Sequence, residues 1–387
     1  MPPLRVLTGT PLSHGFSFPA EWSKQEATWF SWPRPEGISF PGKYHAAPAN
    51  IAAFIREIAP RQTVRINVPN ENYERIARQQ LIAGGVPSRF FAPQTKFEDK
   101  PSRKSRIQFH YIKTNESWCR DHGPAFVTRT HKGKKQFAIV DWGFNAWGGK
   151  YPPFESDDAV PTRIAEEFAA AKRADFVGIF YPKHPPAKNG VPVIMEGGAV
   201  EFNGKGTILT TESCLLNKNR NPSLTKAQLE EFLKDFYGQK HVCWLGDGIV
   251  GDDTDGHIDD LARFLEPRTI VVALETNKRD ANFKILKENY ERVQELRDQD
   301  GKPFDIVEIP MPGVVEHDGQ RLPATYLNFL FINGAVLVPT FGHKKNDKLA
   351  LAILQKHLPK HKVIGVDSVE LIWGLGSIHC LSQQQPA

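Results

Sequence analysis

The stretch AVEFNGKGTIL, residues 199–209, carries the clearest signal for the fold. Two short apolar runs flank Asn203-Gly204, a dipeptide that favours the positive φ angles of a tight β-hairpin. Three similar hairpins are predicted from further pairs of strand-like runs: 125–127 with 137–140, 261–265 with 269–274, and 326–332 with 335–338. The four hairpins therefore recur about every 60 to 75 residues, which indicates a repeated unit.

Helical periodicity lies between the hairpins. It covers residues 51–58, 164–171, 225–237, 283–296 and 349–358. Thr225 and Gln228 have the spacing of a capping box, and Gly238 supplies a stop signal. An open α/β sheet would alternate strands and helices more strictly, so the pattern favours a radial α/β propeller. We predict a single domain spanning residues 1–387.

The composition is that of a soluble globular protein, with 387 residues, 40% apolar residues and a net charge of +5. So slight a positive charge gives no reason to expect nucleic acid as a partner. The N-terminal residues lack a secretory pattern and no apolar run could span a membrane, so we expect no membrane association and a cytoplasmic location. The four cysteines are widely spaced, which argues against a disulfide framework and a structural zinc site: Cys119, Cys214, Cys243 and Cys380.

Residues 116–124, ESWCRDHGP, form the first motif that could carry chemistry. Asp121 could accept hydrogen bonds from a cationic ligand, and Trp118 could cover its flat face. The alternative is a structural ion pair of Arg120 or Asp121, with Trp118 in the core.

Residues 252–260, DDTDGHIDD, form the second motif, directly before a predicted strand. In an extended chain His257 and Asp259 would project to the same side, and a carboxylate beside an imidazole favours its protonated form. The alternative is a solvated turn. A calcium loop is disfavoured because aligning Gly256 with its glycine puts Gly251 at the first ligand position.

The C-terminal segment holds Cys380 behind the glycine-containing run 374–376. Isolated cysteines are commonly inert core residues, and Cys214 and Cys243 have apolar neighbours that indicate such a role. Cys380 has polar neighbours and is the better candidate nucleophile. On a strand the adjacent His379 would point the other way, so His257 is the better base.

Two carboxylates, Asp121 and Asp259, an imidazole and a thiol would form a coherent set if they converge. They suit a planar cation with an electrophilic carbon, such as a guanidinium. A carboxylate can accept two N–H groups of a guanidinium at once. Residues 195–198, 210–212 and 216–222 supply further polar groups, which fit hairpin and helix-entry turns at least as well as a binding role.

Several motifs together resemble the agmatine deiminase family, which is related to bacterial-type peptidyl-arginine deiminases. In chain order they are Glu26-Ala27-Thr28-Trp29 with Trp32-Pro33, Trp118 to Pro124, Asp141 to Gly149, Glu196-Gly197-Gly198, Asn217 to Pro222, Gly256 to Asp259, Tyr326 to Phe329, and Ile378-His379-Cys380. Leu375 interrupts what is often a glycine run in that family, but no catalytic group is missing.

The resemblance implies the pentein α/β propeller, with five ββαβ units around a central active site. It also implies that Cys380 is the nucleophile, His257 the general acid and base, and Asp121 and Asp259 the guanidinium clamps. Trp118 would stack on the substrate, and Asn328 and Glu196 would lie at or near the pocket.

The implied reaction converts agmatine to N-carbamoylputrescine and ammonia through an amidino group on Cys380, a step of polyamine biosynthesis. It needs no metal or organic cofactor. The alternatives are a deiminase of free or peptidyl arginine, an amidinotransferase, and an inactive guanidine- or polyamine-binding protein. The sequence leaves a homo-oligomer open.

Overall fold

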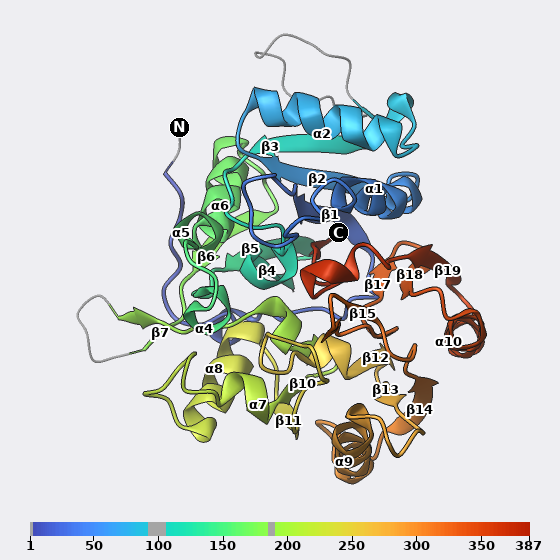
Figure 1. Cartoon of the computed structure of the whole chain (residues 1–387). Coiled ribbons are helices and arrows are strands. Elements are labelled where there is room, and N and C mark those ends of the chain that lie inside the picture. Colours follow the sequence, from blue (N-terminus) through green and yellow to red (C-terminus); the bar gives the residue numbers. More distant parts are fainter. Residues whose placement is uncertain (1–2, 92–105, 185–189) are drawn as a thin grey trace. The chain divides into compact units, whose positions relative to one another are not determined.

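The computed structural model describes residues 3–91, 106–184 and 190–387 (Figure 1). The chain forms two compact units, each assembled from separated stretches of sequence. Unit 1 combines residues 1–21 with 121–309, and unit 2 combines residues 22–120 with 310–387. Within the described ranges, no helix is both long and apolar enough to cross a membrane. The single domain over residues 1–387 stays a prediction.

Unit 1 contains three versions of one arrangement: an antiparallel strand pair, a helix, and a third strand beside the second. They are β4 (Ala125–His131), β5 (Lys134–Val140), α6 (Val160–Ala170) and β6 (Phe176–Phe180); β9 (Glu201–Phe202), β10 (Thr207–Thr211), α8 (Lys226–Tyr237) and β11 (His241–Leu245); and β12 (Ala262–Glu266), β13 (Thr269–Leu274), α9 (Asn282–Glu295) and β14 (Asp305–Pro310). The strands β6 and β11 run parallel to β5 and β10, and such a return requires a crossover connection, which the helices provide.

Unit 2 repeats the arrangement with β17 (Leu330–Ile332), β18 (Ala335–Thr340), α10 (Lys344–His357) and β19 (Lys362–Asp367). Its second sheet has the order β20-β1-β2-β3, from β20 (Ser382–Pro386), β1 (Gln25–Ser31), β2 (Thr63–Val68) and β3 (Ile107–Tyr111). The helices α1 (Ala47–Ile58) and α2 (Glu71–Ala83) pack on each other and on β2. Here the antiparallel pair joins β20 to β1, so distant parts of the chain complete one sheet.

Short helices and turns precede the hairpins and carry most of the candidate catalytic and binding residues. The segments α3 (Cys119–His122), η3 (Gly197–Ala199) and η4 (Ile258–Asp260) directly precede β4, β9 and β12, and residues 377–381 precede β20. The remaining elements are η1 (Leu12–His14), η2 (Ser88–Phe90), α4 (Ala146–Gly149), α5 (Glu155–Asp158), β7 (Lys183–His184), β8 (Val191–Pro192), α7 (Glu212–Leu215), β15 (Glu316–His317), β16 (Gln320–Arg321) and η5 (Ile372–Gly374).

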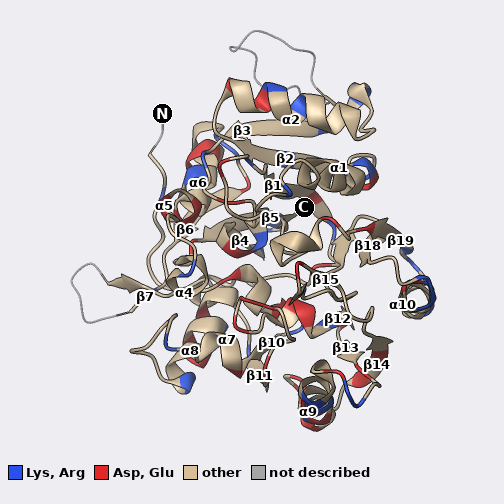
Figure 2. Cartoon of the chain, viewed as in Figure 1, with Lys and Arg blue, Asp and Glu red and all other residues tan. Residues whose placement is uncertain are grey.

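Helix α8 illustrates how the sequence sets its own boundaries. Thr225 and Gln228 form the predicted capping box, and Gly238 ends the helix with φ 62°. A β-carbon at Gly238 would lie 2.0 Å from the carbonyl oxygen of Phe16, so both the backbone angle and the packing require glycine. Helices α2, α9 and α10 carry acidic and basic residues together (Figure 2), in keeping with the slight net charge.

The four predicted hairpins and the α/β class are confirmed. Strands β9 and β17 start later than predicted, because η3 and a turn at residues 326–328 precede them. The predicted helices are confirmed as α1, α6, α8, α9 and α10, although α1, α6 and α10 begin earlier than predicted. The radial arrangement of the units stays a prediction.

Candidate active site

In unit 1, three polar side chains converge on Gly198. A β-carbon at this position would lie 2.6 Å from Nδ1 of His257, 2.9 Å from Oδ1 of Asp121 and 3.2 Å from Oδ2 of Asp259. The Gly198 N–H donates a hydrogen bond of 3.0 Å to Asp121 Oδ1. A side chain on residue 198 would fill the space between these groups, so glycine leaves them open to one another.

Asp121 has further polar contacts in this cluster. Besides Gly198, the indole N–H of Trp147 donates to its Oδ2 at 3.0 Å, and its Oδ1 lies 3.8 Å from His257 Nδ1. Trp147 adopts φ 54°, a backbone angle that bulky residues rarely adopt. The strained backbone therefore goes together with an indole that is aimed at the carboxylate.

Burial and neighbouring charge set the protonation of this pair. Burial raises the pKa of the Asp121 carboxyl from 3.8 to about 6. For His257, burial alone would lower the pKa, but the Asp121 carboxylate, with Cys214 and Asp259, outweighs burial and holds the pKa well above 6.5. At neutral pH the cluster therefore holds an imidazolium beside a carboxylate, and the imidazolium can serve as a proton donor.

Glu196 is buried and forms an ion pair with Arg220, whose Nε lies 2.7 Å from its Oε1. Arg220 also pairs with Asp255 and donates to the Thr254 carbonyl at 2.8 Å. It thereby ties Glu196 to the loop that leads into His257. Arg220 lies in one of the motifs quoted above, but no role was predicted for it, because the contact depends on how the chain folds back.

His257 is fixed mainly through its backbone. Its N–H donates to Asp252 Oδ2 at 3.0 Å, and Thr211 Oγ1 donates to the Gly256 carbonyl at 2.5 Å. The extended chain predicted for residues 257–259 is wrong, because Ile258–Asp260 is a 3-10 helix. His257 and Asp259 still approach the same point beside Gly198, so the predicted proximity holds through a different backbone path.

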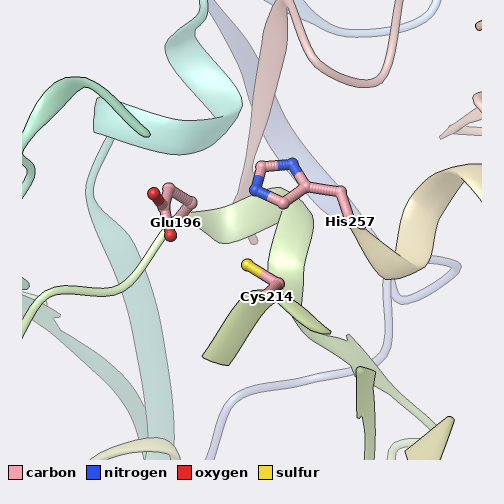
Figure 3. A group of neighbouring side chains, drawn as sticks. All are labelled: Glu196, Cys214 and His257. Atoms are coloured by element: carbon pink, nitrogen blue, oxygen red, sulfur yellow. The ribbon is translucent and has the colours of Figure 1, made fainter. Parts of the chain in front are cut away.

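Cys214 is buried, as its apolar neighbours predicted, but it lies next to His257 (Figure 3). The donor atoms of Glu196, Cys214 and His257 all lie within 4.8 Å of one another. No local pattern indicated this contact, because the cysteine lies on α7 (Glu212–Leu215), far from His257 in the chain.

Unit 2 holds the thiol of Cys380, which is buried. The side-chain amide of Asn328 donates to the sulfur at 2.9 Å, and its carbonyl accepts from the N–H groups of His379 at 3.0 Å and Cys380 at 3.3 Å. Asn328 thus orients the segment and donates to the sulfur at the same time. The strand assumed for His379 is wrong, because residues 379–381 form a turn and β20 starts at Ser382.

Trp118 lies against the same segment of unit 2. A β-carbon at Gly376 would be 2.7 Å from the Trp118 ring and 3.1 Å from Cβ of Cys380. The indole N–H donates to Ser39 Oγ at 2.8 Å, and Ser39 N–H donates to Glu116 Oε2 at 3.0 Å. The contact with Ser39 was not predicted, since residues 34–44 showed no motif.

The predicted site residues therefore fall into two clusters. Asp121, Glu196, His257 and Asp259 meet in unit 1, and Trp118, Asn328 and Cys380 meet in unit 2. That both clusters serve one active site stays a prediction. Each cluster has the groups that a guanidine-modifying enzyme requires, carboxylates with an imidazole in one and a thiol in the other.

Solved structures of similar shape define the class of protein. The agmatine deiminase of Enterococcus faecalis matches with a TM-score of 0.82 and 29% identity, covering 99% of both chains. A C. jejuni agmatine deiminase, a cysteine-to-serine variant with substrate bound, matches with a TM-score of 0.76 and 30% identity over 96% of each chain. An amidinotransferase from Microseira wollei shares the fold alone, with a TM-score of 0.51 at 14% identity. The fold is thus the mixed α/β pentein fold of guanidine-modifying enzymes.

The family follows from the sequence comparisons. The family model of the Porphyromonas-type peptidyl-arginine deiminases matches residues 17–386, and the chain belongs to this family. It is 34% identical to the agmatine deiminase of Pseudomonas aeruginosa strain LESB58, over 98% of both chains. It is 32% identical to that of Medicago truncatula, over 98% of this chain and 99% of the relative. The family resemblance predicted from the motifs is confirmed.

Proposed function

We propose that the protein is an agmatine deiminase, a hydrolase that converts agmatine and water to N-carbamoylputrescine and ammonia. The observation that carries this proposal is the buried cluster of Asp121, His257 and Asp259 at Gly198, in a chain that matches agmatine deiminases along its whole length. Buried carboxylates in such a cluster require a cationic ligand or partner.

Asp121 and Asp259 would hold the guanidinium of the substrate. A guanidinium is protonated at any ordinary pH and presents its N–H groups in a plane, which suits carboxylates placed on two sides. Binding in this way fixes the central carbon and converts an improbable encounter into an oriented one. Burial raises the pKa of Asp121, and a bound guanidinium would favour its carboxylate form.

Cys380 would supply the nucleophile. The mechanism requires its thiolate to reach the guanidinium carbon, forming a C–S bond and a tetrahedral adduct. Asn328 donates to the sulfur, and a hydrogen bond to an anion favours the thiolate over the thiol. Trp118, packed on the Cys380 segment, would cover the flat face of the substrate.

His257 would move the protons of both half-reactions. As imidazolium it protonates the departing nitrogen, the C–N bond breaks, and ammonia leaves an amidino group on the Cys380 sulfur. The neutral imidazole then takes a proton from water, the hydroxide adds to the amidino carbon, and the C–S bond breaks as the hydroxyl proton passes to solvent. The product leaves with oxygen in place of one nitrogen, and the thiolate and the imidazolium are restored.

The tail of the substrate distinguishes agmatine from arginine, which carries an α-carboxylate and needs a cation to bind it. Two candidate cations of unit 1 have other contacts. Arg129 lies over the Phe16 ring and donates to the His14 carbonyl, and Arg163 pairs with Glu166 on an exposed helix surface. Neither contact points to a carboxylate subsite, and this favours agmatine.

The finer description of the fold and setting belongs to the same proposal. The sheet units would form a five-unit propeller around a central site. The protein would act in the cytoplasm, in polyamine biosynthesis. The repeated strand order in the two units supports the propeller.

A substrate panel tests the function. Ammonia release and the mass of the product are measured for agmatine, arginine and an arginine-containing peptide. We expect ammonia with agmatine and a product in which oxygen replaces one nitrogen. Turnover of arginine or of the peptide in its place would assign the alternative deiminase activity, amidine transfer to an added amine would assign an amidinotransferase, and binding without turnover would leave a guanidine-binding protein.

A further inference from the structure

Three side chains of unit 1 with different donor atoms meet in one buried place (Figure 3). They are a carboxylate oxygen of Glu196, the sulfur of Cys214 and a ring nitrogen of His257, all within 4.8 Å of one another. All three residues are buried, at 0% exposure of each whole residue. The proposed reaction uses His257, but it gives Cys214 no task.

The protein does not satisfy every ligand atom of this cluster. Among the described residues, Oε2 of Glu196 has no hydrogen-bond partner, and the ring of His257 is approached by Cys214 and, at 3.8 Å, by Asp121 Oδ1. Arg220 holds only Oε1 of Glu196, at 2.7 Å, which leaves the second oxygen available. Unsatisfied buried polar atoms are costly, so their presence points to a ligand that completes them.

The donor set identifies the chemical class of that ligand. Thiolate, imidazole and carboxylate are together the ligands of Zn²⁺ and of similar thiophilic divalent ions. Bonds of about 2.0 to 2.3 Å to a tetrahedral ion place its ligand atoms roughly 3.5 Å apart, so small side-chain rotations close the distances. The carboxylates of Asp121 and Asp259 beside His257 add negative charge that attracts a cation.

We propose that Glu196, Cys214 and His257 form an inhibitory binding site for a thiophilic divalent ion such as Zn²⁺, with water as the fourth ligand. The ion would coordinate the thiolate of Cys214 and a ring nitrogen of His257, and the protons of the thiol and of the imidazolium would pass to solvent. Its inhibitory effect rests on the proposed function, because a coordinated imidazole cannot move the protons of the reaction. Binding itself does not depend on that function.

Cobalt is the probe that reports the sulfur directly, since Co²⁺ bound to thiolate shows a charge-transfer absorption band. The titration uses the full chain with Cys380→Ser, which removes the other candidate thiol. We expect one equivalent of Co²⁺ to bind with a thiolate band, and Zn²⁺ to displace it. Absence of the band at saturating Co²⁺ would overturn the proposal.

Two cysteine variants in that background assign the ligand. Cys214→Ser should abolish the band, whereas Cys243→Ser should retain it, because Cys243 is a buried thiol of β11 that lies 3.3 Å from the Arg297 carbonyl. A band that survives in Cys214→Ser would refute the site. If circular dichroism shows that Cys214→Ser does not fold, Cys214→Ala takes its place. In either case the presence of the thiolate band in the Cys380→Ser protein tests whether the site exists.

Inhibition is measured separately with Cys380 intact. The Zn²⁺ concentration that halves ammonia release from agmatine should rise at least about tenfold in Cys214→Ser relative to Cys243→Ser, since loss of even an outer partner of a metal site costs that much affinity. A protein with no deiminase activity would contradict the proposed function and leave the cobalt result standing. Equal Zn²⁺ sensitivity of the two variants would refute the inhibitory role.

Discussion

The two clusters of candidate site residues are held in different ways. In unit 1, buried charges hold one another: Asp121 faces His257, and Glu196 faces Arg220. In unit 2, the amide of Asn328 donates to the thiol, and Trp118 packs on the segment that carries it. The difference suits two tasks. A cluster of charges controls protons and binds a cation, whereas a nucleophile needs orientation more than charge.

The largest expected effect is that of Cys380→Ser. If unit 2 supplies the nucleophile, ammonia release from agmatine should fall at least about 10⁴-fold, because removing a nucleophile eliminates the covalent route. Agmatine binding, measured by calorimetry, should persist, since the carboxylates of unit 1 remain. Retained turnover would remove Cys380 from its proposed role.

Asp121→Asn should affect both substrate binding and proton transfer. Loss of one buried carboxylate partner costs about 2 to 4 kcal/mol, so kcat/KM should fall roughly 30- to 1,000-fold. The pKa of His257 should also fall, because burial still favours the neutral imidazole and the opposing carboxylate is gone. Imidazole proton NMR measures this titration.

The matched control for that variant is Asp141→Asn. Asp141 is another buried acid of unit 1, whose burial raises its pKa to about 7 and whose Oδ2 accepts from Thr162 at 2.6 Å. We expect the titration of His257 to be unchanged in the control. An equal shift in both variants would mean that the Asp121 contact does not set the pKa.

Asn328→Ala tests how unit 2 holds its thiol. A hydrogen bond to a charged group contributes about 1.5 to 3 kcal/mol, so kcat should fall roughly 10- to 100-fold. The pKa of the Cys380 thiol, read from the pH dependence of alkylation, should rise. Asn346→Ala removes another side-chain amide of unit 2, one that donates to the Met311 carbonyl at 2.9 Å, and should leave the alkylation profile in place.

Acid should weaken the unit 1 cluster as a binding site. The pKa of Asp121 is about 6, so the fraction of charged carboxylate, and kcat/KM with it, should drop about tenfold one pH unit below that value.

The contribution of Asp121 and His257 to the free energy of unfolding should change with pH in the opposite direction. Asp121 and His257 both have raised pKa values and bind protons more readily in the folded state, so their contribution is present at low pH.

That contribution is lost as pH rises, first through about 6 for Asp121 and then through the higher value of His257. Urea unfolding from pH 4 to pH 9 of the wild type and of Asp121→Asn measures the difference. A wild-type curve that rises over this range by more than that of Asp121→Asn would contradict the pKa directions.

The smallest expected effect is that of Ser39→Ala. It removes the hydrogen bond of 2.8 Å to the Trp118 indole, worth about 0.5 to 1.5 kcal/mol, so KM for agmatine should rise roughly two- to tenfold with little change in kcat. Ser13→Ala, in an exposed turn of η1, is the control. A loss of kcat at constant KM would show that Ser39 does not act through substrate binding.

Local signals account for what the sequence predicted. Asn203-Gly204 marked its hairpin because Gly204 has φ 69° and the Asn203 side chain accepts from the N–H groups of the turn. The polar motifs were visible because each lies just before a hairpin. Helix α2 was missed because only Ala77 and Leu81 are buried along it, which leaves little periodicity.

Contacts across long stretches of sequence account for what it missed. Arg220 joins Glu196 to Asp255, and Cys214 lies beside His257, but nothing in either local sequence indicates its partner. The proximity of His257 and Asp259 was predicted from an extended backbone that does not exist there. The predicted proximity of the two residues is therefore confirmed, whereas the extended backbone from which it was predicted is wrong.

The pairing of β20 with β1 has a consequence for the order of synthesis. Trp29 and Gln385, which share a side-chain hydrogen bond of 3.0 Å, lie 356 residues apart. On the ribosome β1 is synthesised early, but it cannot pair with β20 until the residues between the two strands have been synthesised. The turn with Cys380 leads directly into β20, so the last strand of this sheet to be synthesised is also the one next to the thiol. A nascent chain would thus carry the carboxylates and the imidazole long before it carries the nucleophile.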